Sequence, residues 1–218
     1  MRFHMWHLKC NLIIVHTSRR LLWIRKSSSL QLYDGSLCYN TSQQERSILI
    51  VGDGDLSYSA SIALSNKTSQ LVATVLESEA DHRSIYSDSS RNIDIIRKWG
   101  HQVRFQVDAR DLSKHFDTTT TLFDRIQWNF PHDKGRTNAR NNRDLIKKFF
   151  ASSKDVLNPN SGQIHVALFE HQGGAYCTSL EYWKQSWMPA RYAGEYGLLL
   201  LHVYPFEVRT FLVVFFFH

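Results

Sequence analysis

Two glycines and two acids, Gly52, Asp53, Gly54 and Asp55, directly follow an apolar run in the stretch "ILIVGDGDLSYS". Glycines at the end of a strand allow a sharp turn and a close approach of backbone to ligand, and Ser57 takes the third position of a GxGxxG pattern. Asp53 and Asp55 would each repel the pyrophosphate of a dinucleotide by on the order of 1 kcal/mol. The sulfonium and ammonium groups of S-adenosylmethionine would be attracted instead, so the turn favours that cofactor.

Two further acids follow the next strand-like runs. Glu77 stands near the end of "LVATVLES", where a carboxylate can accept hydrogen bonds from both ribose hydroxyls. Asp108 closes "HQVRFQVDA", within expected reach of the adenine amino group. Simpler roles stay open, because Asp55 can be the N-cap of a helix and the other two can be strand-end or surface acids. Taken together, the acids predict one cofactor pocket.

A second motif, "WNFPH", ends the fourth strand-like run and contains Asn129, Phe130, Pro131 and His132. An amide there can hydrogen-bond a base edge, an aromatic ring can stack on the base, and proline fixes the bend. These four residues are the predicted acceptor site. The alternative is an ordinary proline turn with Phe130 in the core.

A basic stretch follows this motif, in "DKGRTNARNNRDLIKK". Beside an acceptor site, basic side chains of this kind would contact phosphates of RNA; the alternative is a solvated helix face. The predicted RNA-binding residues are Lys134, Arg136, Arg140 and Arg143.

The elements that must position these motifs alternate between short β-type runs and helical patterns from residue 47 onward. Strands are expected at 47–54, 71–78, 101–109, 123–130, 162–169, 198–206 and 209–217, and helices at 56–65, 84–99, 142–157 and 179–193. The last two strands are too close for a helical crossover, so they should pair antiparallel. This predicts an α/β, Rossmann-like class I methyltransferase fold, with a mostly parallel seven-stranded sheet, an antiparallel last strand and helices on both faces.

Composition separates the chain into a basic extension, 1–46, and a predicted methyltransferase domain, 47–218. The net charge of +6 arises from the first 33 residues, which carry six basic residues and no acid. Such an extension can be a disordered tail, a mitochondrial transit peptide or an RNA-binding arm. Three scattered cysteines predict neither a disulfide framework nor a zinc site, no apolar run is long enough to span a bilayer, and neither a metal nor a membrane partner is expected.

These motifs, together with "NI..IRKWGHQVRFQVDA" and "GQIHVAL", resemble in order and spacing the eukaryotic 25S rRNA (uridine-N(3))-methyltransferase family. The resemblance implies methyl transfer from S-adenosylmethionine to N3 of a uridine in large-subunit rRNA, with rRNA or a pre-ribosome as partner. It also implies a nucleolar location, with the cytoplasm or the mitochondrion as alternatives. Gly52, Asp53, Gly54 and Glu77 match its cofactor positions, and 129–132 its acceptor motif.

Chemically, Asn129 could stabilise the uracil anion while His132 or a water takes the proton; a phosphate contact or a structural hydrogen bond is an equal alternative for His132. Methyl transfer of this kind needs the acceptor held in line with the donated methyl. Three rival functions stay open: a methyltransferase with another acceptor, a nicotinamide oxidoreductase, and a non-catalytic RNA-binding relative.

Overall fold

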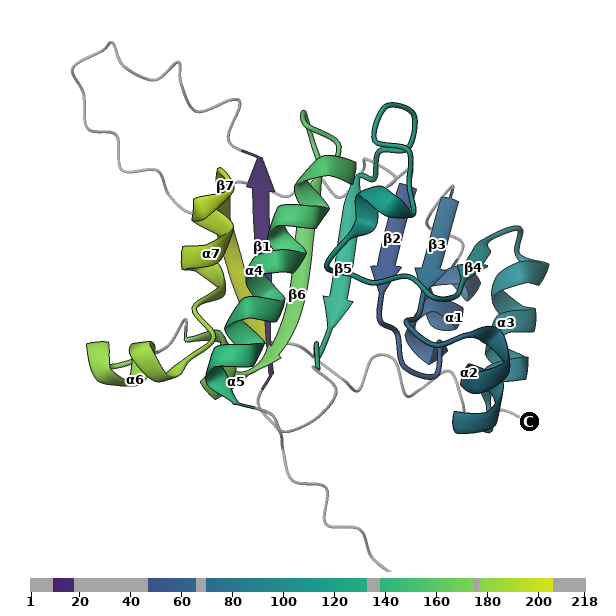
Figure 1. Cartoon of the computed structure of the whole chain (residues 1–218), viewed down its shortest axis with the longest axis horizontal. Coiled ribbons are helices and arrows are strands. Elements are labelled where there is room, and N and C mark those ends of the chain that lie inside the picture. Colours follow the sequence, from purple (N-terminus) through teal and green to yellow (C-terminus); the bar gives the residue numbers. More distant parts are fainter. Residues whose placement is uncertain (1–9, 18–46, 66–69, 133–137, 175–176, 206–218) are drawn as a thin grey trace, which may run out of the picture.

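The computed structural model describes residues 10–17, 47–65, 70–132, 138–174 and 177–205 (Figure 1). Five parallel strands run inward from one edge of the seven-stranded sheet, in the order β4-β3-β2-β5-β6. Their bounds are β2 Ser47–Val51, β3 Gln70–Thr74, β4 Gln102–Arg104, β5 Arg125–Asn129 and β6 Gln163–Phe169. The predicted α/β fold with a parallel sheet is confirmed.

Helices cover both faces of this sheet because successive strand residues point to opposite sides. On β2, Ile48 and Ile50 pack with residues of α1 (Ser57–Leu64) and α3 (Ser89–Lys98). Leu49 and Val51 pack on the other face, in the same core cluster as residues of α4 (Ala139–Val156) and α7 (Pro189–Glu195). Because β2 is buried on both faces, nearly all of its residues are apolar, which explains the continuous apolar run in the sequence.

The N-terminal extension contributes a strand to the sheet. β1 (Cys10–Thr17) lies between β6 and β7 (Leu198–Pro205) and pairs antiparallel with both. The short run "CNLIIV" in β1 thus pairs with strands far along the chain. The predicted domain boundary between residues 46 and 47 therefore separates two segments that belong to the same sheet. The strand expected at 209–217 lies outside the described residues; within them, β7 pairs antiparallel with β1.

Two expected helices are each split into two. The segment expected at 84–99 forms α2 (Glu79–Ile85) and α3; α2 begins earlier because Ser78 Oγ accepts a hydrogen bond from Asp81 N–H at 3.2 Å. The segment expected at 179–193 forms α6 (Leu180–Gln185) and α7. Pro189 at the first turn of α7 has no N–H to donate, so α6 cannot run on through it.

The carboxyl ends of the parallel strands meet at one edge of the sheet, the lower edge in Figure 1. The strand order reverses at β2, with β3 on one side and β5 on the other. Ligands of open α/β sheets bind where the order reverses. The two predicted motifs follow β2 and β5, so the fold brings them side by side at this point.

Candidate functional site

The glycine turn after β2 has two glycines with different tasks. Gly52 has φ of +60°, and a Cβ there would lie 2.7 Å from Trp128 Nε1, so the indole of β5 leaves no room for a side chain. Gly54 has φ of +34°, and no atom lies within 4 Å of the place a Cβ would take. Gly52 therefore serves packing, while the space above Gly54 is open to a ligand.

Asp53 and Asp55 both cap α1. Asp53 Oδ2 accepts hydrogen bonds from Ser59 N–H at 2.7 Å and from Ser59 Oγ at 2.5 Å, and Asp55 Oδ1 accepts from Ser57 N–H at 3.0 Å. Sequence reasoning assigned a capping role to Asp55 alone, so the cap by Asp53 is an addition. It follows because Leu56, with φ of +67° and no polar side chain, leaves the first amides of α1 to the preceding acids.

The Asp53 carboxylate carries an electrostatic penalty. Burial raises the pKa of Asp53 from 3.8 to about 7, and the Asp55 carboxylate adds to the rise, while the hydrogen bonds from Ser59 oppose it. A carboxyl group whose pKa is raised by burial is stabilised in its charged form when a cation binds beside it. The turn is thus suited to a positively charged ligand.

Three polar residues of α2 and α3 hold the glycine turn from outside and were not predicted. His82 is fully buried; its Nε2 lies 2.6 Å from the Gly54 carbonyl oxygen and its Nδ1 lies 2.5 Å from Ser89 Oγ. Asn92 Nδ2 donates to the Asp55 carbonyl at 2.9 Å. The signal in the sequence was Ser89 and Asn92 on the apolar face of a helix, beside Ile93 and Ile96, where a polar group needs a partner.

Glu77 and Asp108 lie beyond the ends of β3 and β4. Glu77 lines a hollow of about 380 Å³ together with Ser78 and Gln106, and no residue of the glycine turn lines this hollow. Asp108 is instead paired with Arg110, whose Nη2 lies 2.7 Å from Oδ2, and the Arg110 guanidinium holds the pKa of Asp108 below its usual range. An adenine amino group would have to compete with Arg110 for this carboxylate.

The predicted acceptor motif continues from β5. Asn129 Oδ1 accepts a hydrogen bond from Gln127 Nε2 at 2.9 Å, an orientation that leaves the Asn129 amide protons for another acceptor. Phe130 adopts φ of +51°, a left-handed conformation that is uncommon for a bulky residue and that often marks functional sites. Pro131 is buried and His132 is exposed. Gln127 was missed by sequence reasoning, although it is polar within a buried strand.

The basic residues predicted to contact RNA differ in their surroundings. Lys134 and Arg136 lie outside the described residues, and Arg140 is exposed in the first turn of α4. Arg143 has partners within the protein, because its guanidinium donates to the carbonyls of Lys184 and Ser186 and so caps the end of α6. A phosphate would have to displace these carbonyls, so Arg143 is a structural residue in this arrangement.

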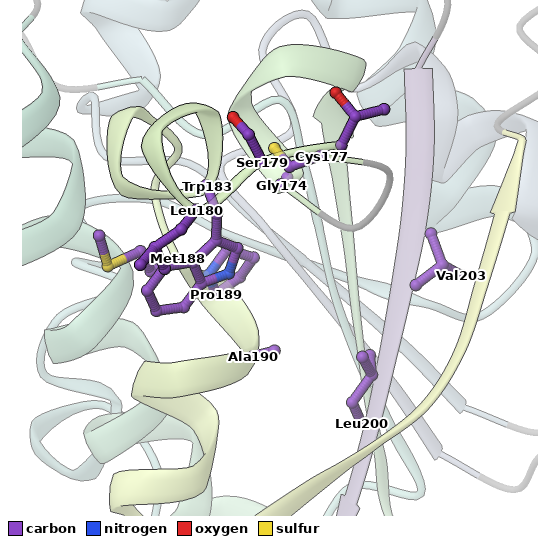
Figure 2. A pocket seen from close by; sticks show the side chains of 12 residues that line it. Gly174, Cys177, Ser179, Leu180, Trp183, Met188, Pro189, Ala190, Leu200 and Val203 are labelled. Carbon is purple, nitrogen blue, oxygen red and sulfur yellow. The ribbon is translucent and has the colours of Figure 1, made fainter.

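A second hollow, of about 530 Å³, is formed by different elements (Figure 2). Trp183 and Met188 line it from the α6 and α7 side, and Leu200 and Val203 line it from β7, with Cys177 at its upper end. None of the predicted site residues that the structure describes lines this cavity, so it is separate from the β2 and β5 motifs.

Within the described part of the chain, no cluster of three or more His, Cys, Asp or Glu side chains could hold a metal ion. The same residues include no helix that is both long and apolar enough to cross a membrane.

Residues 49–213 match the family model described as rRNA (uridine-N3-)-methyltransferase BTM5-like. The chain is 35% identical over 169 residues to human ferredoxin-fold anticodon-binding domain-containing protein 1, a match that covers 76% of this chain and 26% of that protein. It is 32% identical over 136 residues to heavy metal-associated isoprenylated plant protein 41 of Arabidopsis thaliana, over 59% of this chain and 26% of that protein. Each match spans about a quarter of the relative's length.

Among solved structures, spermidine synthase from Thermotoga maritima superposes with a TM-score of 0.43 at 15% identity, over 71% of this chain and 45% of that one. The family assignment does not depend on this superposition. With the family model matching most of the described sheet and both predicted motifs, the chain belongs to the BMT5-like family of RNA methyltransferase-like proteins.

Proposed function

We propose that this chain transfers a methyl group from S-adenosylmethionine to N3 of a uridine in large-subunit rRNA. The observation that carries the proposal is the pairing of β2 with β5, in which Val51 lies opposite Trp128. This pairing sets the glycine turn and the Asn129 motif on neighbouring strands at one edge. A donor bound at the first and a base bound at the second would be adjacent, as in-line transfer requires.

The residues present fit the proposed cofactor. The space above Gly54 is open, Asp53 offers a carboxylate to a cation, and the hollow at Glu77 offers a carboxylate to ribose hydroxyls. When bound, S-adenosylmethionine supplies an electrophilic methyl group on a sulfonium.

On the acceptor side, the chain must orient the base and accept a proton. The Asn129 amide, fixed by Gln127, can donate to a uracil carbonyl and so stabilise negative charge as N3 loses its proton. His132, exposed two residues beyond Phe130, is the proposed proton acceptor, directly or through water. With the base held in this way, N3 would be the atom that accepts the methyl group as its bond to the sulfonium sulfur breaks.

The proposed partner is rRNA within a pre-ribosome, and the proposed location is the nucleolus. Arg140, exposed at the start of α4, is the described basic residue best placed for a phosphate contact. Replacing Arg140 by Ala should weaken RNA binding about equally for all sequences and reduce the salt slope by about 1. Arg143→Ala should instead lower thermal stability, because it removes the cap of α6.

The test begins with calorimetric titration of the purified chain with S-adenosylhomocysteine, repeated on Asp53→Ala and Glu77→Ala. We expect micromolar binding by the unchanged chain and its loss in both variants. Digestion of rRNA incubated with the chain and S-adenosylmethionine, followed by nucleoside mass spectrometry, should then show 3-methyluridine. A folded chain that binds no S-adenosylhomocysteine would leave the non-catalytic RNA-binding relative as the better account.

A further inference from the structure

Three aromatic rings are in successive contact at the carboxyl edge of the sheet, beginning with Phe130 of the proposed acceptor motif. Phe130 follows β5, and its N–H donates to the Ala167 carbonyl of β6 at 2.9 Å, which brings it beside the end of β6. There its ring lies 5.3 Å from that of Phe169, between ring centroids, at an interplanar angle of 36°. The Phe169 ring lies 6.2 Å from that of His171, in α5 (Glu170–Gly173), at an angle of 10°.

These rings are not part of the hydrophobic core. Neither Phe130 nor Phe169 is a member of the two core clusters; both are half-buried, and His171 is exposed. Phe130 also holds a left-handed conformation that costs on the order of 1 kcal/mol or more in a non-glycine residue. Packing alone therefore does not explain why the strand ends place the rings together at this edge.

We propose that Phe130, Phe169 and His171 form a stacking platform for unpaired RNA bases. Aromatic side chains bind the flat faces of bases, which are accessible only where RNA is single-stranded, looped or opened. Phe130 directly follows Asn129 in the chain, and its ring contact with Phe169 continues to His171 at the start of α5, so bases next to the acceptor uridine would stack on Phe169 and His171. The platform rests on the proposed function, since it assigns to the same site a preference for single-stranded RNA over duplex.

The test compares two RNA probes by fluorescence anisotropy: a labelled 12-nucleotide oligouridine, and the same strand paired with oligoadenine. We expect Phe169→Leu, which keeps an apolar side chain of similar size, to bind the single strand about tenfold more weakly, as expected for loss of one stacked base. His171→Leu should weaken it less, Phe169→Trp should retain binding, and affinity for the duplex should be unchanged in all three.

Trp99→Ala is the matched control. Trp99 is an aromatic residue, 44% exposed, at the end of α3 just before β4, and so lies at the opposite edge of the sheet. It should bind both probes like the unchanged chain. The platform would be overturned if folded Phe169→Leu bound the single strand as tightly as the unchanged chain does. It would also be overturned if Trp99→Ala lost as much single-strand affinity as Phe169→Leu, or if Phe169→Leu lost affinity for the duplex to the same extent.

Titration with S-adenosylhomocysteine separates this inference from the proposed function. Phe169→Leu should bind S-adenosylhomocysteine as the unchanged chain does, because β5 separates β6, which ends at Phe169, from β2 and its glycine turn. Failure of the unchanged chain to bind it would contradict methyl transfer while the anisotropy result still decides the platform.

Discussion

Replacing Asp53 by Asn should make the chain more stable and at the same time a weaker binder of S-adenosylmethionine. Asn keeps an acceptor for Ser59 N–H but removes the charge whose burial raises the pKa of Asp53 to about 7. The unfolded Asp ionises near 3.8, so the folded chain holds the proton more tightly between these values. Stability contributed by the proton is therefore full below pH 4 and lost as the pH rises through 7.

The size of the stability change follows from the two pKa values. At about 1.36 kcal/mol per pKa unit, the step from 3.8 to about 7 sets an upper limit of about 4 kcal/mol. Asp53 remains partly accessible to solvent, and solvent screening reduces the effect below this limit. We therefore expect the free energy of unfolding of Asp53→Asn to be about 1 to 3 kcal/mol higher at pH 8, or the Tm several degrees higher for a chain of this size. Near pH 4 the two chains should differ little.

Ligand affinity should show the opposite trend. With a pKa of about 7, Asp53 is about nine-tenths ionised at pH 8 and about one-tenth ionised at pH 6. If the ionised form binds the cationic ligand, the apparent Kd should rise about tenfold between pH 8 and pH 6. Asp53→Asn should bind weakly at both pH values with no such slope.

The assays are thermal unfolding by circular dichroism and calorimetric titration with S-adenosylmethionine, each at pH 4 to 8 where the chain is folded. A variant less stable than the unchanged chain at pH 8 would refute the burial argument. A flat affinity profile in the unchanged chain, or the same slope in Asp53→Asn, would refute the role of the carboxylate in cation binding.

Three other substitutions separate packing, turn geometry and buried charge. Gly52→Ala should destabilise the chain by about 2 kcal/mol or more, because its Cβ meets Trp128 Nε1; Gly54→Ala should cost less in thermal unfolding and more in S-adenosylhomocysteine affinity, and the reverse order would contradict the division of tasks. His82→Ala should cost about 2 kcal/mol and weaken S-adenosylhomocysteine binding, because the Gly54 carbonyl loses its partner; unchanged affinity in calorimetry would show that the turn needs no clamp. Burial, together with the nearby Arg125 charge, lowers the pKa of His165 to about 3 in the folded chain. The unfolded imidazole takes up a proton as the pH falls from 7.5 to 5 while the folded one does not, so the free energy of unfolding should fall by about 2 kcal/mol over this range. A His165→Gln variant whose free energy of unfolding shows the same pH dependence would show that another group is responsible.

Local patterns were enough to predict the parallel sheet and the place of the glycine turn. The apolar run before Gly52 and the glycines themselves are signals within a dozen residues, and both motifs follow the strands expected to hold them. The hydrogen bonds of His82 and Asn92 to the glycine turn join residues 28 and 37 positions apart, so only the fold shows that they reach the Gly54 and Asp55 carbonyls. The polarity of Ser89 and Asn92 beside Ile93 and Ile96 on α3 was the hint in the sequence.

The roles of individual site residues were harder to predict from the sequence, because they depend on which side chains and carbonyls lie nearby. Asp108 and Arg143 have the charge that their predicted roles require, but Arg110 and the end of α6 take up that charge. Such competition depends on three-dimensional neighbours and not on residue type. The strand in the N-terminal extension was missed for the same reason, since a short run with an apolar centre forms a strand only where partners exist.

The position of β1 has a consequence for the order in which the chain folds. Among the strands that the structure describes, β1 is synthesised first, yet its partners β6 and β7 are the last two. The five parallel strands can assemble as they emerge, whereas β1 must wait and then insert between two strands that arrive late. Until that insertion, one apolar strand and the edges of two others are open to pairing with other chains, which makes the final step of folding the one most exposed to aggregation.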